Sequence, residues 1–208
     1  MVKITLGDSY ATLAELRARV KITDASFTAE DARLTSALAV ASRGIEKVCN
    51  RQFNDAGSTS AREFEPCHDK WLDIDDFSTT TGLVVKFDSA GDGTFATTLA
   101  ATTYKAYPLN GIVDGESGWP FWKLKAVNTC WPVYWQLPPI QVTARWGWTA
   151  VPAAVKEGCL ILAEEVYKLA DSPFGVGGYS QFGIVRARDN PMVWARVGPY
   201  ARDPVLVA

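Results

Sequence analysis

The residues most capable of chemistry are scattered and do not form a recognisable catalytic motif. His68 is the only histidine in the chain, which removes most histidine-based triads and multi-histidine metal sites. Its neighbour Cys67 could form a nucleophilic Cys–His pair with it. However, consecutive residues on a strand point to opposite faces, so direct activation is geometrically poor. We therefore interpret both residues as structural.

An acidic cluster and a glycine-rich loop are the remaining candidates for a ligand site. The cluster consists of Asp69, Asp73, Asp75 and Asp76. It lacks the glycine and the terminal glutamate of an EF-hand loop, so we interpret it as a solvated strand and turn. The loop at residues 175–178 lacks the Lys-Ser or Lys-Thr of a phosphate-binding loop, and we expect it to be flexible at Gly175, Gly177 and Gly178. The sequence thus predicts no catalytic, cofactor-binding or metal-ligating residue.

Tryptophans are concentrated in the middle of the chain. Seven of the eight lie between Trp71 and Trp148. Such a cluster suits an aromatic platform for sugars or single-stranded nucleic acid, or else the core and interface of a small β domain. Residues 52–122 carry 4 basic and 11 acidic residues, and the whole chain has a net charge of −2. Because nucleic-acid binding favours a basic surface, we prefer the interpretation as core and interface.

Three amphipathic helices are expected to frame this middle region. A capping box of Thr12 with Glu15 begins the first, and the second begins at Thr28. The third begins at Pro152 and continues to about Leu169. Apolar residues recur every three or four positions along the second and third helices, which predicts that these two pack against each other. Leu160, Ile161 and Tyr167 widen the apolar surface of the third helix, so we expect it to make a contact on a second side as well.

Alternating apolar and polar residues predict β-strands between the helices. Residues 140–148 show the period of a half-buried strand, as do residues 83–87 before a turn at residues 91–93. Leu72 with Ile74, and Trp122 with Leu124, indicate two more short strands. Further along, residues 182–185 suggest a strand. A last short helix begins at Asn190-Pro191 and ends at Gly198-Pro199.

Together these elements predict an α+β fold. We expect a small helical bundle, with three main helices and a short C-terminal helix, into which an antiparallel β subdomain is inserted. Residues 1–53 and 150–208 would form one helical body, and residues 54–149 the tryptophan-rich insert. Hydrophobic residues make up 48% of the chain and charged residues 21%, which is ordinary for a folded soluble protein.

The chain shows no sign of export or membrane insertion. It has no apolar run long enough to cross a bilayer, and its first residues lack the apolar core of a secretory signal. Its four cysteines have no paired spacing, so we expect small buried thiols in a reducing compartment. Cytoplasmic synthesis without membrane association follows as an expectation.

The order of these parts resembles the head-to-tail connector (adaptor) family of tailed bacteriophages. Residues 10–17 match a short first helix, and residues 41–53 resemble the family's "A-S-x-x-I-E-x-x-x-x-R-x-F" helix end. Residues 142–156 resemble a strand that ends near Gly-Trp and leads through Val-Pro into a long third helix. The loop at 171–178 and the segment up to Arg202 form the third match. Residues 54–139 match only as a β insert of variable length.

The resemblance implies a non-enzymatic protein of the virion neck, assembled in the host cytoplasm as a ring of twelve copies. Its partners would be the portal protein on one side and a stopper or tail-completion protein on the other. Double-stranded DNA would pass through the ring without sequence-specific binding, and the acidic insert would repel its phosphates. By analogy with the family, the portal contact would comprise Val185, Arg186, Arg188, Met192, Trp194, Arg196, Tyr200 and Arg202.

Other interpretations fit parts of the sequence. Arg and Trp are common at interfaces, but Trp194 could equally well cap the core. The tryptophan cluster suits a carbohydrate-binding or cell-surface-binding module, which requires exposed, coplanar rings. An enzyme that uses Asp73 with Asp75 or Asp76 requires a concave pocket with strongly perturbed carboxylates. Neither alternative function explains the paired helices on both sides of the insert.

Overall fold

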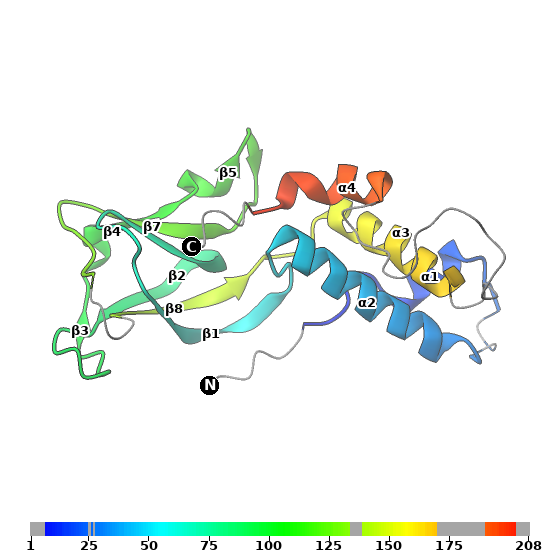
Figure 1. The fold of residues 1–208 in the computed structure, drawn as a ribbon, viewed down its shortest axis with the longest axis horizontal. Helices are drawn as coiled ribbons and strands as arrows, with labels where there is room; N and C mark the ends of the chain where they lie inside the picture. Colours follow the sequence, from blue (N-terminus) through cyan, green and yellow to red (C-terminus); the bar gives the residue numbers. More distant parts are fainter. Residues whose placement is uncertain (1–6, 25, 27, 134–138, 170–189, 203–208) are drawn as a thin grey trace. The chain divides into compact units, whose positions relative to one another are not determined.

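A computed structural model describes residues 7–24, 26, 28–133, 139–169 and 190–202 of the chain (Figure 1). These residues divide into two compact units. One, which we call the helical unit, contains residues up to 53 and from 151 onward, and the other, the β unit, contains residues 54–150. Four α-helices and antiparallel strands occur in the described part, so the predicted α+β class is confirmed. Within that part, no helix is long and apolar enough to cross a membrane.

The helical unit contains α1 (Leu13–Arg19), α2 (Asp31–Cys49), α3 (Ala153–Leu169), α4 (Pro191–Val197) and the short 3₁₀ turn η3 (Gly198–Tyr200). The capping box at the start of α1 is confirmed, because the Thr12 hydroxyl accepts from the Glu15 N–H at 3.2 Å and the Glu15 carboxylate accepts from the Thr12 N–H at 2.8 Å. The expected start of α2 at Thr28 was wrong. Thr28 offers only its backbone carbonyl, to the Asp31 N–H at 3.1 Å, so a turn precedes the helix.

The cores of α2 and α3 face each other, as the apolar spacing predicted. An ideal Cβ on Gly44 of α2 would lie 3.5 Å from Leu162 Cδ2 of α3, so the backbone of α2 approaches α3 closely there. The apolar period that begins at Leu34 predicts a buried Val48, but Cys49 is the buried residue at the end of α2. The period of α3 likewise predicts a buried Leu169, which is 50% exposed.

The second apolar side of α3 is covered within the chain. An ideal Cβ on Gly158 would lie 2.9 Å from Val197 Cγ1 and 3.8 Å from Val193 Cγ1, both on α4. Val193 and Val197 are fully buried. Leu160 and Ile161, which widen the apolar surface of α3, are 9% and 6% exposed, so the expected second contact of α3 is made within the chain and not with a neighbouring subunit.

The β unit contains a twisted antiparallel sheet with the strand order β1-β8-β2-β7-β4, and β3 pairs with one end of β2. A separate hairpin is formed by β5 and β6. The strands are β1 (Asp55–Phe64), β2 (Trp71–Phe87), β3 (Thr97–Thr98), β4 (Tyr104–Tyr107), β5 (Ile112–Val113), β6 (Glu116–Ser117), β7 (Phe121–Ala126) and β8 (Ile140–Gly147). Two short 3₁₀ turns, η1 (Ala101–Thr103) and η2 (Leu109–Gly111), flank β4.

The strand β2 is longer than expected. The two strands predicted near Leu72 and at residues 83–87 are one continuous strand. Its register to β8 shifts between Phe77 and Thr79 and again before Val84, so bulges interrupt the alternation that the prediction relied on. By contrast, the alternation predicted for β8 is confirmed, since Ile140, Val142, Ala144 and Trp146 are all buried.

Gly147 at the end of β8 holds the closest backbone approach in the β unit. Its φ is +91°, and an ideal Cβ there would lie 1.7 Å from the carbonyl oxygen of Asn54. No side chain fits at that distance, so glycine is required on both counts. The adjacent Trp146 is buried and donates its indole N–H to the Ser60 carbonyl at 2.9 Å. The Trp-Gly-Trp sequence thus closes this end of the sheet.

Candidate protein-docking site

The residues with the chemistry of a catalytic or metal site are dispersed in the β unit. Cys67 and His68 are exposed in the turn between β1 and β2. Among the described residues, no group of three or more His, Cys, Asp or Glu side chains could hold a metal ion.

The expectation of buried thiols was half right: Cys49 and Cys159 are buried and Cys67 and Cys130 are exposed, and all four are free. Burial raises the pKa of the Cys49 thiol to about 12, which makes it unreactive at neutral pH.

The acidic cluster is divided among separate partners. Asp73 pairs with Lys123 at 3.0 Å, and Asp75 pairs with Arg62 at 2.6 Å. Asp76 is buried and accepts from the Trp148 indole N–H at 3.1 Å. Because each carboxylate is satisfied on its own, the three do not form the shared pocket that an acidic enzyme site requires.

Asp88, in the loop that follows β2, has a specific structural role. It is 1% exposed, and its carboxylate accepts from the N–H groups of Ala90 at 3.1 Å and of Gly91 and Gly93 at 2.8 Å each. Burial opposes its ionisation, but the backbone donors outweigh burial and hold the pKa of Asp88 below its usual range. A single carboxylate thus fixes the loop after β2.

The tryptophans of the β unit form core and edge contacts. Trp131, Trp146 and Trp148 are buried, and Trp71, Trp119 and Trp122 are half-buried. The Trp119 ring is tilted by 51° against Trp148 and by 61° against Trp122. Rings at such angles do not present the coplanar platform that a sugar-binding module requires. Trp135 lies outside the described residues.

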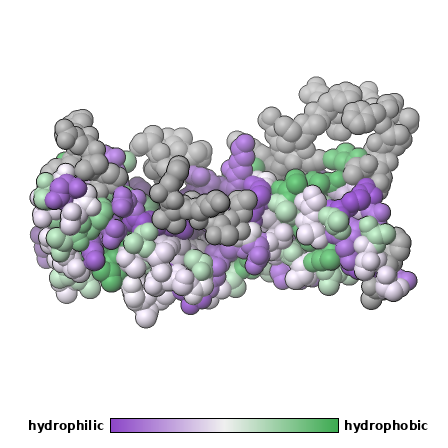
Figure 2. All heavy atoms as spheres, turned by 90° about the horizontal axis from the view of Figure 1, so that it is seen from below, coloured by the Kyte–Doolittle hydropathy of each residue, from purple (hydrophilic) through white to green (hydrophobic). Residues whose placement is uncertain are grey.

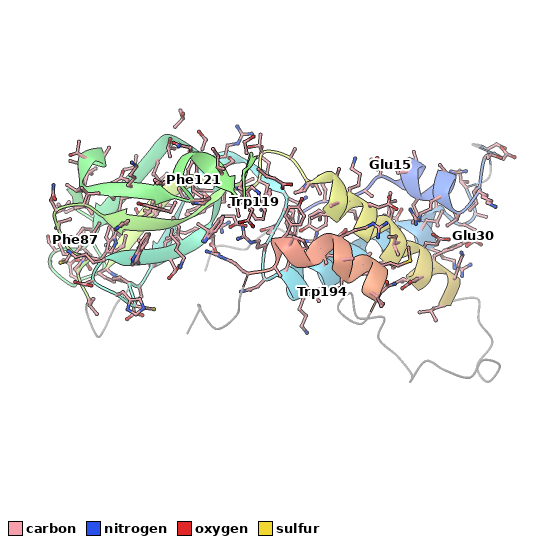
Figure 3. All side chains as sticks on the ribbon, turned by 90° about the horizontal axis from the view of Figure 1, so that it is seen from above. Glu15, Glu30, Phe87, Trp119, Phe121 and Trp194 are labelled. Atoms are coloured by element: carbon pink, nitrogen blue, oxygen red, sulfur yellow. The ribbon has the colours of Figure 1, made fainter. Side chains whose placement is uncertain are left out.

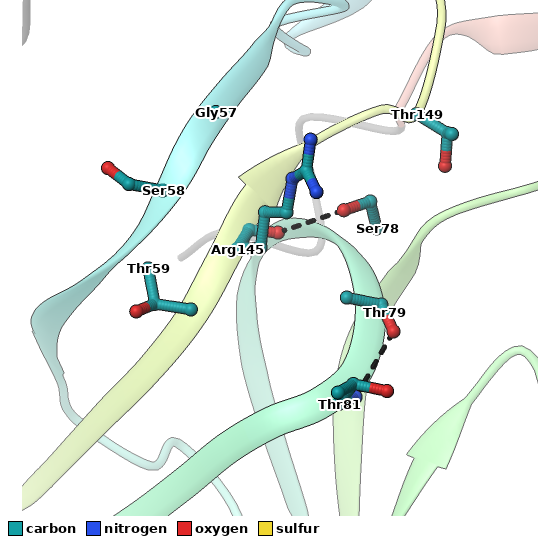
Figure 4. A pocket seen from close by; sticks show the side chains of 8 residues that line it. All are labelled: Gly57, Ser58, Thr59, Ser78, Thr79, Thr81, Arg145 and Thr149. Carbon is teal, nitrogen blue, oxygen red and sulfur yellow. Dashed lines mark hydrogen bonds between the residues drawn. The ribbon is translucent and has the colours of Figure 1, made fainter.

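A shallow hollow on the β unit is lined mainly by small hydroxyl side chains (Figure 4). Its one cation, Arg145, makes a bidentate ion pair with Asp55, which lowers the pKa of that carboxyl group. Ser78 donates to the Arg145 carbonyl at 3.3 Å. The hollow can therefore form hydrogen bonds, but its lining carries no nucleophile activated by a base. Its lining residues are Gly57, Ser58, Thr59, Ser78, Thr79, Thr81, Arg145 and Thr149.

The candidate portal contact includes α4, which has one buried and one exposed face. Asn190 caps its start, accepting from the N–H groups of Met192 at 2.9 Å and Val193 at 3.1 Å. This predicted helix start is confirmed. On the outer face, Met192 is 58% exposed and Trp194 is 37% exposed (Figure 3). Apolar side chains with this exposure form a candidate docking surface, and we call Met192 with Trp194 the α4 pair.

The residues that follow the α4 pair hold it in place. An ideal Cβ on Gly198 would lie 3.1 Å from the Trp194 ring, so the indole covers the end of its own helix. Arg196 donates to the Met192 carbonyl at 2.8 Å. The Tyr200 ring meets Phe53 edge-on at 6.1 Å, and the Arg202 N–H donates to the Cys49 carbonyl at 2.8 Å. These contacts tie the segment to the end of α2.

The structure thus describes five of the eight residues predicted for the portal contact. It brings them together on α4 and the segment after it, with the apolar pair outward. The other three predicted contact residues, Val185, Arg186 and Arg188, lie outside the described residues. The predicted strand at residues 182–185 and the loop glycines Gly175, Gly177 and Gly178 lie outside them too.

Several other apolar residues are exposed that the sequence pattern did not single out. Val40 on α2 is 53% exposed, and Leu109 and Ile112 beside the β5–β6 hairpin are 42% and 46% exposed. Figure 2 shows hydrophobic side chains in small patches among hydrophilic ones on one face. Val40 follows the buried Leu38 by only two positions, so its outward direction could have been read from the helical period.

Comparison with known proteins identifies the fold. No protein-family model and no curated protein sequence matches the chain. Among solved structures, it is similar to a chain of the neck of an empty gene transfer agent (GTA) particle computed with C6 symmetry, at a TM-score of 0.59 and 20% identity. It is also similar to a chain of the neck of the native particle computed with C12 symmetry, at a TM-score of 0.56 and 16% identity. It is similar as well to a chain of the virion of the native GTA particle, at a TM-score of 0.53 and 18% identity. Each match covers 94% of this chain and 91% of the other, so nearly the whole fold is shared.

Proposed function

We propose that this protein is a structural adaptor of a phage-type virion neck, which forms a ring beneath the portal and joins the head to a stopper or tail-completion protein. The observation that carries the proposal is the fold shared over 94% of the chain with neck proteins of GTA particles. That those necks were computed with C6 and C12 symmetry supports a cyclic assembly, and we propose twelve copies. The sequence resemblance to connector proteins supports the same role independently.

Within this role, we assign portal docking to the α4 pair and the arginines around it. Trp and Arg are the residues that most often dominate binding energy at protein interfaces. Trp194 keeps 37% of its surface exposed although α4 buries its other face against α3. A helix anchored on one side with an aromatic residue on the other can present that residue rigidly, which reduces the entropy lost on binding.

The electrostatics of the β unit are compatible with a DNA channel. Five acidic residues outside strand β1 are exposed and have no cation partner in the described part of the chain. Asp55, Asp73 and Asp75 are paired with cations, and Asp76 and Asp88 are buried. Exposed carboxylates repel DNA phosphates, so DNA would move past them without binding. Tight binding of DNA by the purified chain at physiological salt would contradict this part of the proposal. These five residues are Glu65, Asp69, Asp92, Asp114 and Glu116.

The proposal is tested by native mass spectrometry of the full chain, alone and mixed with its cognate portal ring. We expect a portal-dependent closed ring of the chain. Trp194→Ala should weaken portal binding by tenfold or more, because removing a central aromatic residue from an interface commonly costs about 2 kcal/mol or more.

Val40→Ala is the matched control, because it shortens another exposed apolar side chain of the helical unit. It should bind the portal like the wild type. Melting temperatures of both variants separate lost docking from lost folding, since the Trp194 ring also covers Gly198. A chain that ignores the portal contradicts the proposed function, and equal binding by Trp194→Ala and wild type contradicts the role of α4.

A further inference from the structure

The two edges of the main sheet differ in how they are protected. Strand β1 forms one edge and β4 the other, and in the described part of the chain neither pairs on its outer side. Unpaired edges are templates for strand addition, and proteins usually protect them with charged residues, proline or short length. β4 is four residues long, carries Lys105 at its exposed centre and is followed by Pro108.

Strand β1 lacks most of this protection. It is ten residues long, its first seven residues are exposed, and it contains no proline. Two of its charges are neutralised within the chain, because Asp55 pairs with Arg145 and Arg62 pairs with Asp75. Glu63 remains as an exposed carboxylate without an ion pair in the described residues, and Lys105 on β4 is likewise exposed and unpaired there. Each edge therefore offers one free charge, and the two charges are opposite.

The direction of the strands fits a head-to-tail arrangement. Four antiparallel pairings separate β1 from β4, from β1 to β8, β2, β7 and then β4. Because each pairing reverses the direction, β1 and β4 run the same way. A rotation about an axis along the strands would bring β4 of one copy beside β1 of the next in parallel. Such a heterologous contact generates a ring when its rotation closes, whereas pairing of β1 with β1 would give only a two-fold dimer.

We propose that β1 of one copy pairs with β4 of the next copy, with Glu63 opposite Lys105, so that the sheets form a continuous belt around the ring. The inference rests on the ring of the proposed function and names the surface that closes it. The occupant of the β1 edge is thus a second copy of this chain. Backbone hydrogen bonds would supply affinity, as in other strand additions, and the charge pair would set the register.

A charge exchange tests the pairing without disturbing the fold, because both side chains are exposed and unpaired. Ring formation by the full chain on its cognate portal is measured by native mass spectrometry. We expect Glu63→Lys and Lys105→Glu each to weaken assembly about tenfold per interface, and the double exchange to restore it. Glu116→Lys on the β5–β6 hairpin makes the same charge change elsewhere and should assemble normally.

Cross-linking then separates the two ways in which edges could pair. In a Cys67→Ser, Cys130→Ser background, Glu63→Cys combined with Lys105→Cys should give a ladder of disulfide-linked copies under mild oxidation by oxidised glutathione. Glu63→Cys alone should stay monomeric in a denaturing gel. A dimer from that single variant would show β1–β1 pairing and overturn the inference.

The outcomes also distinguish this inference from the proposed function. A wild-type chain that never forms a ring overturns both. The edge pairing alone is overturned if both single charge variants form rings as well as the wild type, so that the double exchange has nothing to restore, and if no cross-linked ladder appears. If Lys105 serves only to protect the edge, Lys105→Glu assembles like the wild type, and that result also counts against the inference.

Discussion

The helical unit and the β unit achieve their packing by different means. In the helical unit, apolar side chains from α2, α3 and α4 meet around two helical glycines, Gly44 and Gly158, and the closest approach involves a valine methyl group. In the β unit, the glycine with the least room for a side chain is Gly147, where an ideal Cβ would meet a backbone atom, the carbonyl oxygen of Asn54. Side chains can change rotamer when crowded, whereas a backbone carbonyl in a sheet moves only with its strand. We therefore expect glycine substitutions in the helical unit to change the unfolding free energy only slightly, and substitution of Gly147 in the β unit to lower it strongly.

The largest effect should come from Gly147→Ala. The new methyl group would lie 1.7 Å from the Asn54 carbonyl oxygen, at a φ of +91° that alanine rarely adopts. The junction of β8 with the start of β1 would have to open, so we expect a loss of more than about 4 kcal/mol in unfolding free energy. Urea denaturation followed by tryptophan fluorescence measures it.

Gly91→Ala is the matched control for that variant. Gly91 has a φ of +70°, but nothing lies within 4 Å of an ideal Cβ there. It should therefore lose only the backbone strain, about 1 kcal/mol. Similar losses in the two variants would show that conformation rather than close approach makes Gly147 necessary, and would remove the contrast between the units.

A smaller effect is expected where helices meet. Gly158→Ala would place a methyl group 2.9 Å from Val197 Cγ1, which requires either the Val197 side chain or α4 to shift. We expect a loss of about 1–2 kcal/mol, because overpacking is only partly offset by the higher helix propensity of alanine. Thermal unfolding followed by circular dichroism measures the change.

Gly44→Ala sharpens this prediction, because its new methyl group would lie 3.5 Å from Leu162 Cδ2, an ordinary contact. Helix propensity should then dominate, and the variant should gain about 0.5–1 kcal/mol. A loss in Gly44→Ala as large as that in Gly158→Ala would mean that α2 and α3 pack more tightly than α3 and α4.

The same contrast explains how much of the fold could be predicted from the sequence. Helix starts depend on local signals such as the Thr12–Glu15 capping box, and helix pairing depends on a period that Leu34, Leu38 and Ile45 follow. Strand β1 was not predicted, because its first seven residues are exposed and show no alternation. The long β2 was predicted as two strands because bulges break its period.

The docking site could be predicted only in part for a related reason. The helix start at Asn190-Pro191 is a local signal and could be found. Which face of α4 is buried depends on Gly158 of α3, a contact between residues about forty positions apart that no local pattern encodes. Trp194 therefore remained ambiguous between core and interface until its exposure of 37% was known.

An effect that depends on pH is expected at the Asp88 loop of the β unit. Because the pKa of Asp88 is lowered on folding, its contribution to stability is complete above the ordinary aspartate pKa of about 4 and is lost as the pH falls through the lowered value. Asp88→Asn replaces one acceptor oxygen with an N–H₂ group, which would face either the N–H groups of Ala90 and Gly91 or that of Gly93. It should melt several degrees below the wild type at pH 6, with the gap narrowing below pH 4. Asp92→Asn, at an exposed position in the same loop, is the control and should melt closer to the wild type at pH 6. If the difference in melting temperature between Asp88→Asn and the wild type does not change with pH, the loop is held by its shape rather than by the charge of Asp88.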